Sequence, residues 1–339
     1  WADYRRGQGF LVEVVDVADV FDEFNYGVLG ADSIKSFLQY ARNNWQTSPR
    51  YVLLLGDATY DPRNYQGFAS QGALDYVPVK IVTTVFSETA SDDAFADFNN
   101  DGQAQMAVGR IPARDAQTVT NAFNKTTTFE QASRSLNDGV LFAHDWDPAT
   151  WDFPAESDRL GALLPAGTPL TKVGRTDSSG TVDPNGQQNL VNAINAGKFV
   201  VNYSGHGSTG IWFNTNFFGI NDVVNCTGQP ICINNPGRES IFLSLSCLNG
   251  YFIRPDADSL SEVLLKATNG GAVVVWSSTG ETTPDIQEDM GRQFYSQLGT
   301  STTMTRMGDF MLDAKTAIPG GPDVRLTFSL LGDPMLKIK

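Results

Sequence analysis

The sequence contains few residues of the types that carry out nucleophilic and acid–base chemistry. Among its 339 residues there are only two histidines and three cysteines, so a mechanism that uses imidazole or thiolate has few candidates. Lysine and arginine are also scarce, because 24 of them stand against 38 acidic residues and give a net charge of −14. A surface this acidic repels phosphate backbones, and we therefore expect no nucleic-acid partner.

Long apolar runs are missing as well. No run approaches the roughly 20 residues that cross a bilayer, and the longest, Gly271 to Trp276, has the length of a strand, so we expect no membrane span. Hydrophobic residues nevertheless make up 41% of the chain and aromatic residues 11%, which is enough for a packed core and excludes a disordered chain. At roughly 150 residues per domain, the length suggests about two domains.

Short β-rich runs alternate with amphipathic segments along the chain. Strands are expected at residues 10–17, 51–55, 77–82, 105–108, 139–143, 198–203, 240–245 and 271–276. Helices are expected at residues 31–45, 112–134, 154–164, 189–195, 258–267, 285–298 and 301–314. This alternation predicts an α/β fold, and the pattern restarts after residues 134–138. We therefore expect two α/β subdomains, 1–135 and 136–339, each with a mostly parallel sheet flanked by helices.

A histidine and a cysteine each follow a buried strand in the second half. Val200 to Ser204 runs into Gly205-His206-Gly207, and Ile241 to Ser246 runs into Cys247. If these strands are parallel neighbours, both loops lie at the same edge of the sheet, and His206 can activate Cys247 as a nucleophile. The glycines beside His206 allow close backbone approach, and free N–H groups there could stabilise an oxyanion.

Several blocks of sequence resemble the gingipain family of cysteine peptidases, which shares a clan with caspases and legumains. Tyr203-Ser-Gly-His206-Gly-Ser and Ser246-Cys247-Leu-Asn-Gly250 are similar to its histidine and cysteine motifs. Further similar blocks are Gly56-Asp57, Gly109-Arg110-Ile-Pro112 and Gly332-Asp333-Pro334, so the likeness covers nearly the whole chain. The resemblance implies a caspase-like α/β fold, a His206/Cys247 dyad, and oxyanion donors from the backbone of Gly207 and Cys247.

The resemblance also implies roles for two acidic residues. Asp145 follows the strand that ends near Ala143, where the family places an acidic partner for the histidine. Asp158 matches the acid that lines the primary specificity pocket of arginine-specific members, which would favour a basic residue before the scissile bond. The alternative is that Asp158 has no role in a pocket and, as an acid in the first turns of a helix, only complements the helix dipole. His144 is expected to be an exposed loop residue without a catalytic role.

An acidic segment between residues 92 and 102 has the pattern of a calcium loop. Alternating oxygen ligands at Asp97, Asn99 and Asp101 precede Gly102, but Val108 stands where an EF-hand has its glutamate. Asp92 or Asp93 could complete the ligand set, and related peptidases bind calcium. We expect a structural calcium ion here and no organic cofactor, with a solvated acidic turn as the alternative. Histidine and cysteine do not occur at zinc-ligand spacing.

The remaining two cysteines indicate the compartment. Cys226 and Cys232 are six positions apart in a turn-rich stretch, a spacing that a small disulfide loop could close. This pairing, with the acidic composition and low lysine content, favours a secreted or cell-surface protein, whereas three buried thiols in a reducing cytosol remain the alternative.

These features lead to a main hypothesis and three competing ones. The main hypothesis is a secreted cysteine endopeptidase that hydrolyses proteins or peptides through a Cys247 acyl-enzyme, with His206 as acid and base. A sortase-like transpeptidase would resolve the same intermediate with an amine. A calcium-stabilised surface module with a vestigial dyad belongs to another class. A nucleotide-binding protein fits least, because Gly205-x-Gly207 lacks the third glycine of the dinucleotide fingerprint and no Walker lysine motif occurs.

Overall fold

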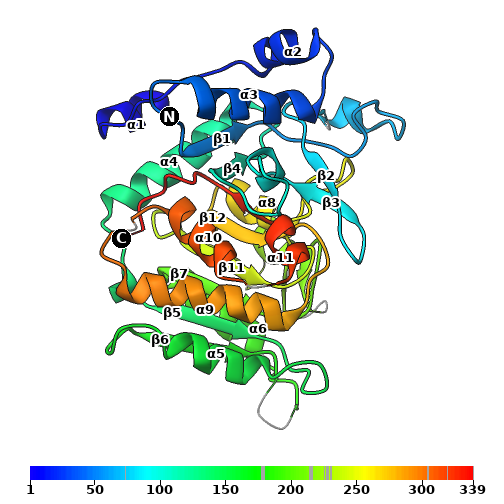
Figure 1. Ribbon diagram of the computed structural model, residues 1–339. Helices are drawn as coiled ribbons and strands as arrows, with labels where there is room; N and C mark the ends of the chain where they lie inside the picture. Colours follow the sequence, from blue (N-terminus) through cyan, green and yellow to red (C-terminus); the bar gives the residue numbers. More distant parts are fainter. Residues whose placement is uncertain are drawn as a thin grey trace.

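A single eight-stranded sheet forms the centre of the protein. A computed structural model describes residues 1–72, 74–176, 180–213, 217–224, 226, 229, 231–303, 305–318 and 320–338. In spatial order the strands are β1 (Tyr51–Leu55), β4 (Ala107–Ile111), β13 (Phe328–Leu331), β12 (Ala272–Ser278), β11 (Ser240–Leu245), β7 (Val200–Ser204), β5 (Val140–His144) and β6 (Leu170–Gly174). Figure 1 shows them from β1 at one end of the sheet to β6 at the other. Neighbouring strands are parallel except for β12 and β13, which confirms the predicted α/β class with a mostly parallel sheet.

The strands of both halves of the chain lie in one sheet. β13, close to the end of the sequence, pairs with β12 on one side and, through Leu331 and Arg110, with β4 on the other. The expectation of a separate sheet in each half is therefore corrected. All four residues of β13 are buried, so this strand is stabilised by neighbours on both of its sides. The boundary between residues 135 and 136 stays a prediction and coincides with the start of a short 3-10 helix, η3 (Leu136–Asp138).

Helices cover both faces of the sheet. They are α1 (Ala2–Gly7), α2 (Val17–Asn25), α3 (Ala31–Asn44), α4 (Ala116–Gln131), α5 (Phe153–Gly161), α6 (Gly186–Asn195), α7 (Asn221–Val224), α8 (Leu260–Lys266), α9 (Pro284–Thr300), α10 (Met307–Thr316) and α11 (Pro322–Thr327), with the 3-10 helices η1 (Phe68–Gln71) and η2 (Asp93–Phe95). Val140 and Phe142 of β5 face the core beneath α5, α9 and α10, whereas Leu141 and Ala143 face the core beneath α6 and α8. This alternation along a continuous apolar strand is what a sheet buried on both faces requires.

The N-terminal segment contains a wrong prediction. Residues 10–16 do not form a strand, and Leu11 and Val14 are 83% and 74% exposed. No described strand lies next to this segment, so its backbone has no ladder partner. Instead the Asp16 carboxylate accepts a hydrogen bond from the Ala18 amide and caps α2. Figure 1 shows α3 next to β1 and α2 beyond α3, at the end of the sheet farthest from β6.

Two small sheets complete the fold. β2 (Lys80–Thr83) and β3 (Glu88–Ser91) form an antiparallel pair, and β8 (Gly207–Ser208), β9 (Ile211–Trp212) and β10 (Phe218–Gly219) form a three-stranded sheet directly after His206. Within the described ranges, no helix is long and apolar enough to cross a membrane.

Candidate active site

β7 and β11 place the candidate histidine and cysteine loops side by side. The two strands are parallel neighbours in which Ser204 pairs with Leu245, so His206 and Cys247 each come two residues after the paired ends. The Gly205 amide donates a hydrogen bond to the Leu245 carbonyl at 3.2 Å, which continues the pairing beyond the strands. The structure therefore brings the two predicted dyad residues to one edge of the sheet, as the parallel arrangement requires.

The Cys247 thiol is in contact with the loop after the next strand, β12. Its sulfur accepts a hydrogen bond from the Thr282 amide at 3.4 Å and donates to the Thr282 carbonyl at 3.5 Å. Burial raises the pKa of Cys247, the contacts with Thr282 oppose that rise, and the negative charge of Glu281 adds to it. In this arrangement the resting side chain is a thiol, and its ionisation needs a base.

His206 is held between an acid and two aromatic rings. Its Nε2 lies 3.0 Å from Oδ2 of Asp147, and its ring packs edge-on against Phe153 with centroids 5.8 Å apart. Phe213 lies on another side at 6.0 Å and is itself covered by the Arg175 guanidinium. The imidazole remains 43% exposed and is therefore accessible to a substrate.

The acid that contacts the His206 imidazole is Asp147, whereas the predicted Asp145 interacts with His206 through the His206 backbone amide and by charge. Asp145 continues the sheet, since its amide donates to the Ser204 carbonyl, and its side chain is completely buried with Oδ1 bound to the Trp146 amide. Two residues further, Asp147 begins a surface turn and reaches the imidazole. The Thr150 hydroxyl and then His206 hold the pKa of Asp147 below its usual value, so it is a carboxylate at neutral pH.

The sequence contained both acids and no signal that separated them. Alternation along an extended chain turns neighbouring residues to opposite faces, but Asp145 and Asp147 are two positions apart and both come after β5. Only the turn closed by the Trp151 amide on the Asp147 carbonyl distinguishes them. His144 was expected to be exposed, but it is the last residue of β5 and is buried, and burial lowers its pKa.

The backbone of the two predicted oxyanion donors is in close contact. A Cβ atom added to Gly207 would lie 2.5 Å from the Cys247 carbonyl oxygen, so only glycine fits there. Cys247 is followed by Leu248 with a φ of 61°, a left-handed conformation that a leucine seldom adopts. Such a sharp turn directly after the cysteine is typical of a functional strand-to-loop junction.

An open depression of about 390 Å³ lies between α5, α9 and the turn after β5. It is lined by Trp151, Arg159, Asp285, Glu288, Asp289 and Arg292. Both oxygens of Glu288 accept hydrogen bonds from Arg159 at 2.6 Å, so the charge of this arginine is already paired. The depression begins next to the residues that hold His206, since Trp151 bridges to Asp147.

Comparison with known proteins identifies the family. A family model described as peptidase family C25 matches residues 1–339. The chain belongs to peptidase family C25. The predicted membership of the gingipain family is therefore confirmed.

Two sets of relatives support this membership. Gingipain R2 and gingipain R1 of Porphyromonas gingivalis are each 21% identical over 357 aligned residues that include all of this chain. This chain spans 44% of the length of gingipain R2 and 32% of the length of gingipain R1. Among solved structures, the complex of the RgpB pro- and mature domains has a TM-score of 0.77 at 19% identity, over 100% of this chain and 76% of that one. The crystal structure of the Arg-specific cysteine proteinase gingipain R has a TM-score of 0.73, also at 19% identity, over 99% and 76%. These likenesses confirm the predicted caspase-like fold.

Asp158, the predicted pocket residue, lies on the outer surface of α5. Its side chain is 68% exposed and forms an ion pair with Lys172 of β6. The acid of this helix that points inward is Glu156, which is buried and was not singled out from the sequence. Position within the helix decides this difference, because residues two apart lie on different faces.

The predicted calcium ligands do not converge on a common point. Both oxygens of Asp92 bind the Arg110 guanidinium, and Asp93 is paired with Lys315. Asp97 accepts hydrogen bonds from the amides of Asp101 and Gly102 in a local turn, and Asn99 is exposed to solvent. Across the described part of the chain, no three acidic, histidine or cysteine side chains gather as a metal site. In this arrangement the carboxylates are bound to Arg110, Lys315 and backbone amides, and calcium binding by this chain stays a prediction.

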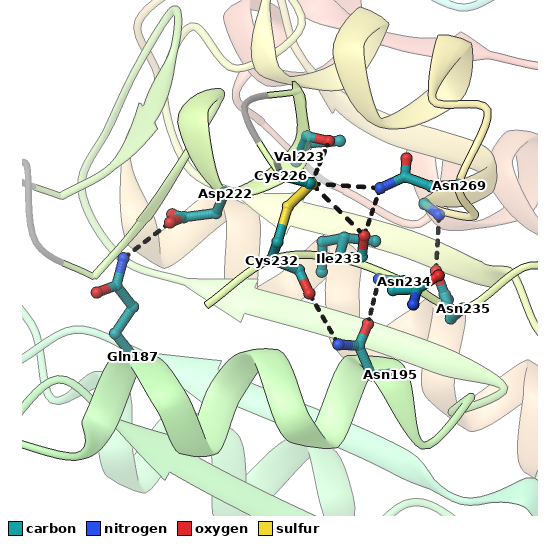
Figure 2. Close-up of a disulfide and its surroundings, with 11 residues drawn as sticks. Gln187, Asn195, Asp222, Val223, Cys226, Cys232, Ile233, Asn234, Asn235 and Asn269 are labelled. Carbon is teal, nitrogen blue, oxygen red and sulfur yellow. Dashed lines mark hydrogen bonds between the residues drawn. A yellow bond between two sulfur atoms is a disulfide. The ribbon is translucent and has the colours of Figure 1, made fainter. Parts of the chain in front are cut away.

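Cys226 and Cys232 form the predicted disulfide, with Cα atoms 5.4 Å apart. Figure 2 shows it surrounded by asparagines: Asn195 donates to the Cys232 carbonyl at 2.9 Å, and Asn269 donates to the Cys226 sulfur at 3.3 Å. Cys247 is a free thiol. The three cysteines therefore divide as expected into one disulfide and one free thiol.

Proposed function

We propose that this chain is a cysteine peptidase in which Cys247 is the nucleophile and His206 the acid and base. The observation that carries the proposal is the parallel pairing of β7 with β11, which places both residues at one sheet edge with His206 bound to Asp147. Membership of peptidase family C25 supports the same chemistry. Thiol and imidazole together are the groups that acyl-enzyme formation requires.

The protonation states of the site determine the course of the reaction. Substrate binding covers the half-exposed imidazole, and His206 takes the proton of the Cys247 thiol while Asp147 stabilises the resulting imidazolium. The thiolate attacks the peptide carbonyl, and the amides of Gly207 and Cys247 stabilise the oxyanion. His206 then returns the proton to the leaving amine, and water releases the acyl group from Cys247.

We also propose a preference for substrates with basic residues near the scissile bond. Four acids at the site support this preference. Asp147 lies beside His206, and Glu281 precedes Thr282, which contacts the Cys247 thiol. Asp285 and Asp289 line the depression. Such a negative surface attracts cationic side chains and accelerates their association. The name of one structural neighbour refers to an Arg-specific proteinase, which agrees with this preference. An extracellular or cell-surface location is supported by the disulfide.

Point variants test the catalytic assignment. Cys247→Ala is expected to abolish hydrolysis of casein and of a diverse peptide library, and His206→Ala to lower kcat by about 10²-fold or more. Asp147→Asn should lower kcat less than His206→Ala does. Asp32→Asn, at an exposed aspartate of α3 that pairs with Lys80, is the matched control and should behave as wild type. Hydrolysis that persists in Cys247→Ala would refute the proposal, and product masses with an added amine would reveal transpeptidation.

A further inference from the structure

Four buried polar side chains form a continuous hydrogen-bonded chain beneath the candidate active site. The Tyr295 hydroxyl of α9 donates to Asn202 at 3.2 Å, Asn202 donates to the Ser204 hydroxyl at 3.0 Å, and Ser204 donates to Glu156 of α5 at 2.6 Å. Each of these residues is at most 1% exposed. Every donor points in the same direction, so the chain ends on a carboxyl oxygen of Glu156.

The surroundings of Glu156 disfavour a negative charge. Burial raises its pKa to about 8, the negative charge of Glu288 adds to the rise, and Ser204, Trp151 and Arg159 oppose it. Arg159 is committed to Glu288, with two hydrogen bonds of 2.6 Å. Among the described residues, Glu156 has no ion pair, and the neighbouring Tyr295 is neutral because burial raises its pKa. At neutral pH the raised pKa of Glu156 favours the protonated carboxylic acid.

Glu156 is connected to His206 by two short routes. Ser204 is the last residue of β7, pairs with His144 and Leu245 on its two sides, and is followed two residues later by His206. Glu156 also belongs to α5, whose first residue, Phe153, packs against the His206 ring. The bond between Glu156 and Ser204 therefore fixes the helix that supports the imidazole to the strand that carries it.

We propose that Glu156 is a positioning residue that holds His206 in its working orientation only while its carboxyl group is protonated. Loss of this proton places an unpaired carboxylate between α5 and β7, opposite Glu288. Relief of that buried charge requires α5 to move away from the strand or water to enter between them, and Phe153 moves with the helix. The inference rests on the proposed function where it concerns activity, but its structural part does not.

The structural part is tested by NMR titration, because the protein contains only two histidines. The imidazole resonances of His206, assigned by their loss in His206→Ala, are expected to show a separate inflection close to pH 8 in the wild type. Glu156→Gln keeps an oxygen acceptor for Ser204 but cannot ionise, so this inflection should vanish. Glu239→Gln, at a buried glutamate before the opposite end of β11, should retain it. A wild-type titration without the inflection overturns the proposal, even if Glu156→Gln does not fold.

The catalytic part is tested by the pH profile of kcat. One pH unit above the pKa of Glu156, only about a tenth of the molecules retain the proton, so at pH 9 Glu156→Gln should keep roughly tenfold more of its maximal kcat than the wild type. KM should change little. An alkaline limb at the same pH in both proteins contradicts the positioning role. If no peptide is hydrolysed by the wild type, the proposed function fails, whereas the NMR titration still decides the role of Glu156.

Discussion

Replacement of Asp92 by asparagine is expected to destabilise the protein strongly. Asp92 and Arg110 form a two-pronged ion pair in which Nε and Nη2 of Arg110 donate to the two carboxylate oxygens at 2.8 and 2.7 Å. Arg110 is completely buried and also donates to the carbonyls of Gly56 and Val77. The charge of each residue in this pair is compensated by the charge of the other.

The magnitude depends on the burial of the pair. An Asp92→Asn variant leaves the buried Arg110 guanidinium without its hydrogen-bonded counter-charge, and only the charge of Asp75 still acts on it through space. Breaking such a buried pair typically costs 3–5 kcal/mol, roughly a third of the stability of an ordinary protein. The amide introduced at position 92 also points an N–H group at the Arg110 guanidinium, which has no hydrogen-bond acceptor. The Gly56 and Val77 carbonyls remain, but they cannot neutralise the charge. We therefore expect the free energy of unfolding to fall by about 3–5 kcal/mol.

Equilibrium urea unfolding, monitored by tryptophan fluorescence, measures this loss. Asp101→Asn is the matched control, because Asp101 belongs to the same acidic segment but is exposed and makes one local bond to the Gln103 amide. It should cost less than about 1 kcal/mol. If the free energy of unfolding of Asp92→Asn lies within about 1 kcal/mol of the wild-type value, which is the precision of urea data, the ion-pair reasoning is refuted.

The same experiment separates the ion pair from the calcium hypothesis. If Asp92 and Asp101 were ligands of one calcium ion, both variants would destabilise the protein similarly, and a chelator would reproduce the effect in the wild type. If Asp92 instead acts only through its ion pair with Arg110, Asp92→Asn is strongly destabilised and Asp101→Asn is not. A chelator then leaves the difference in stability between the two variants unchanged.

Two further predictions concern stability. The pKa of Glu156 is raised from 4.5 to about 8 by folding, so its contribution to stability is complete below pH 4.5 and is lost as the pH rises through 8. The loss is on the order of 5 kcal/mol, and urea midpoints at pH 5 and pH 8 should differ clearly less in Glu156→Gln than in the wild type; equal differences would contradict this. Replacing Cys226 and Cys232 by serine opens a loop of six positions and should lower the free energy of unfolding by about 2 kcal/mol, and reductant should then have no further effect on the variant.

Much of the core topology was predictable because it depends on local patterns. The runs Tyr51–Leu55 and Ser240–Leu245 were predicted at their observed bounds, since short and mostly apolar runs of five or six residues are typical of buried strands. Residues 10–17 were mispredicted for the opposite reason. Their apolar side chains suit a strand, but a strand needs a neighbour, and sequence alone does not show whether one exists.

In the candidate site, too, local patterns were predictable and contacts between distant residues were not. His206 and Cys247 were predicted because each comes shortly after a strand, and the loops after parallel strands meet at one edge of the sheet. The acids were harder: Asp147 replaces Asp145 at the imidazole, Asp158 faces solvent, and Glu156 points inward. A carboxylate's role depends on which partner it meets, and the Asp93 partner, Lys315, is 222 residues away in the chain.

The sequence by itself determined the α/β class, the family, and the two residues proposed to perform the chemistry, because hydrophobic periodicity and short motifs are local properties. The tertiary structure decided which charges are paired, which acid contacts the histidine, and that the last strand joins both halves in one sheet. Charges and hydrogen bonds act over a few ångströms in space, and neither their partners nor their burial is fixed by distance along the chain.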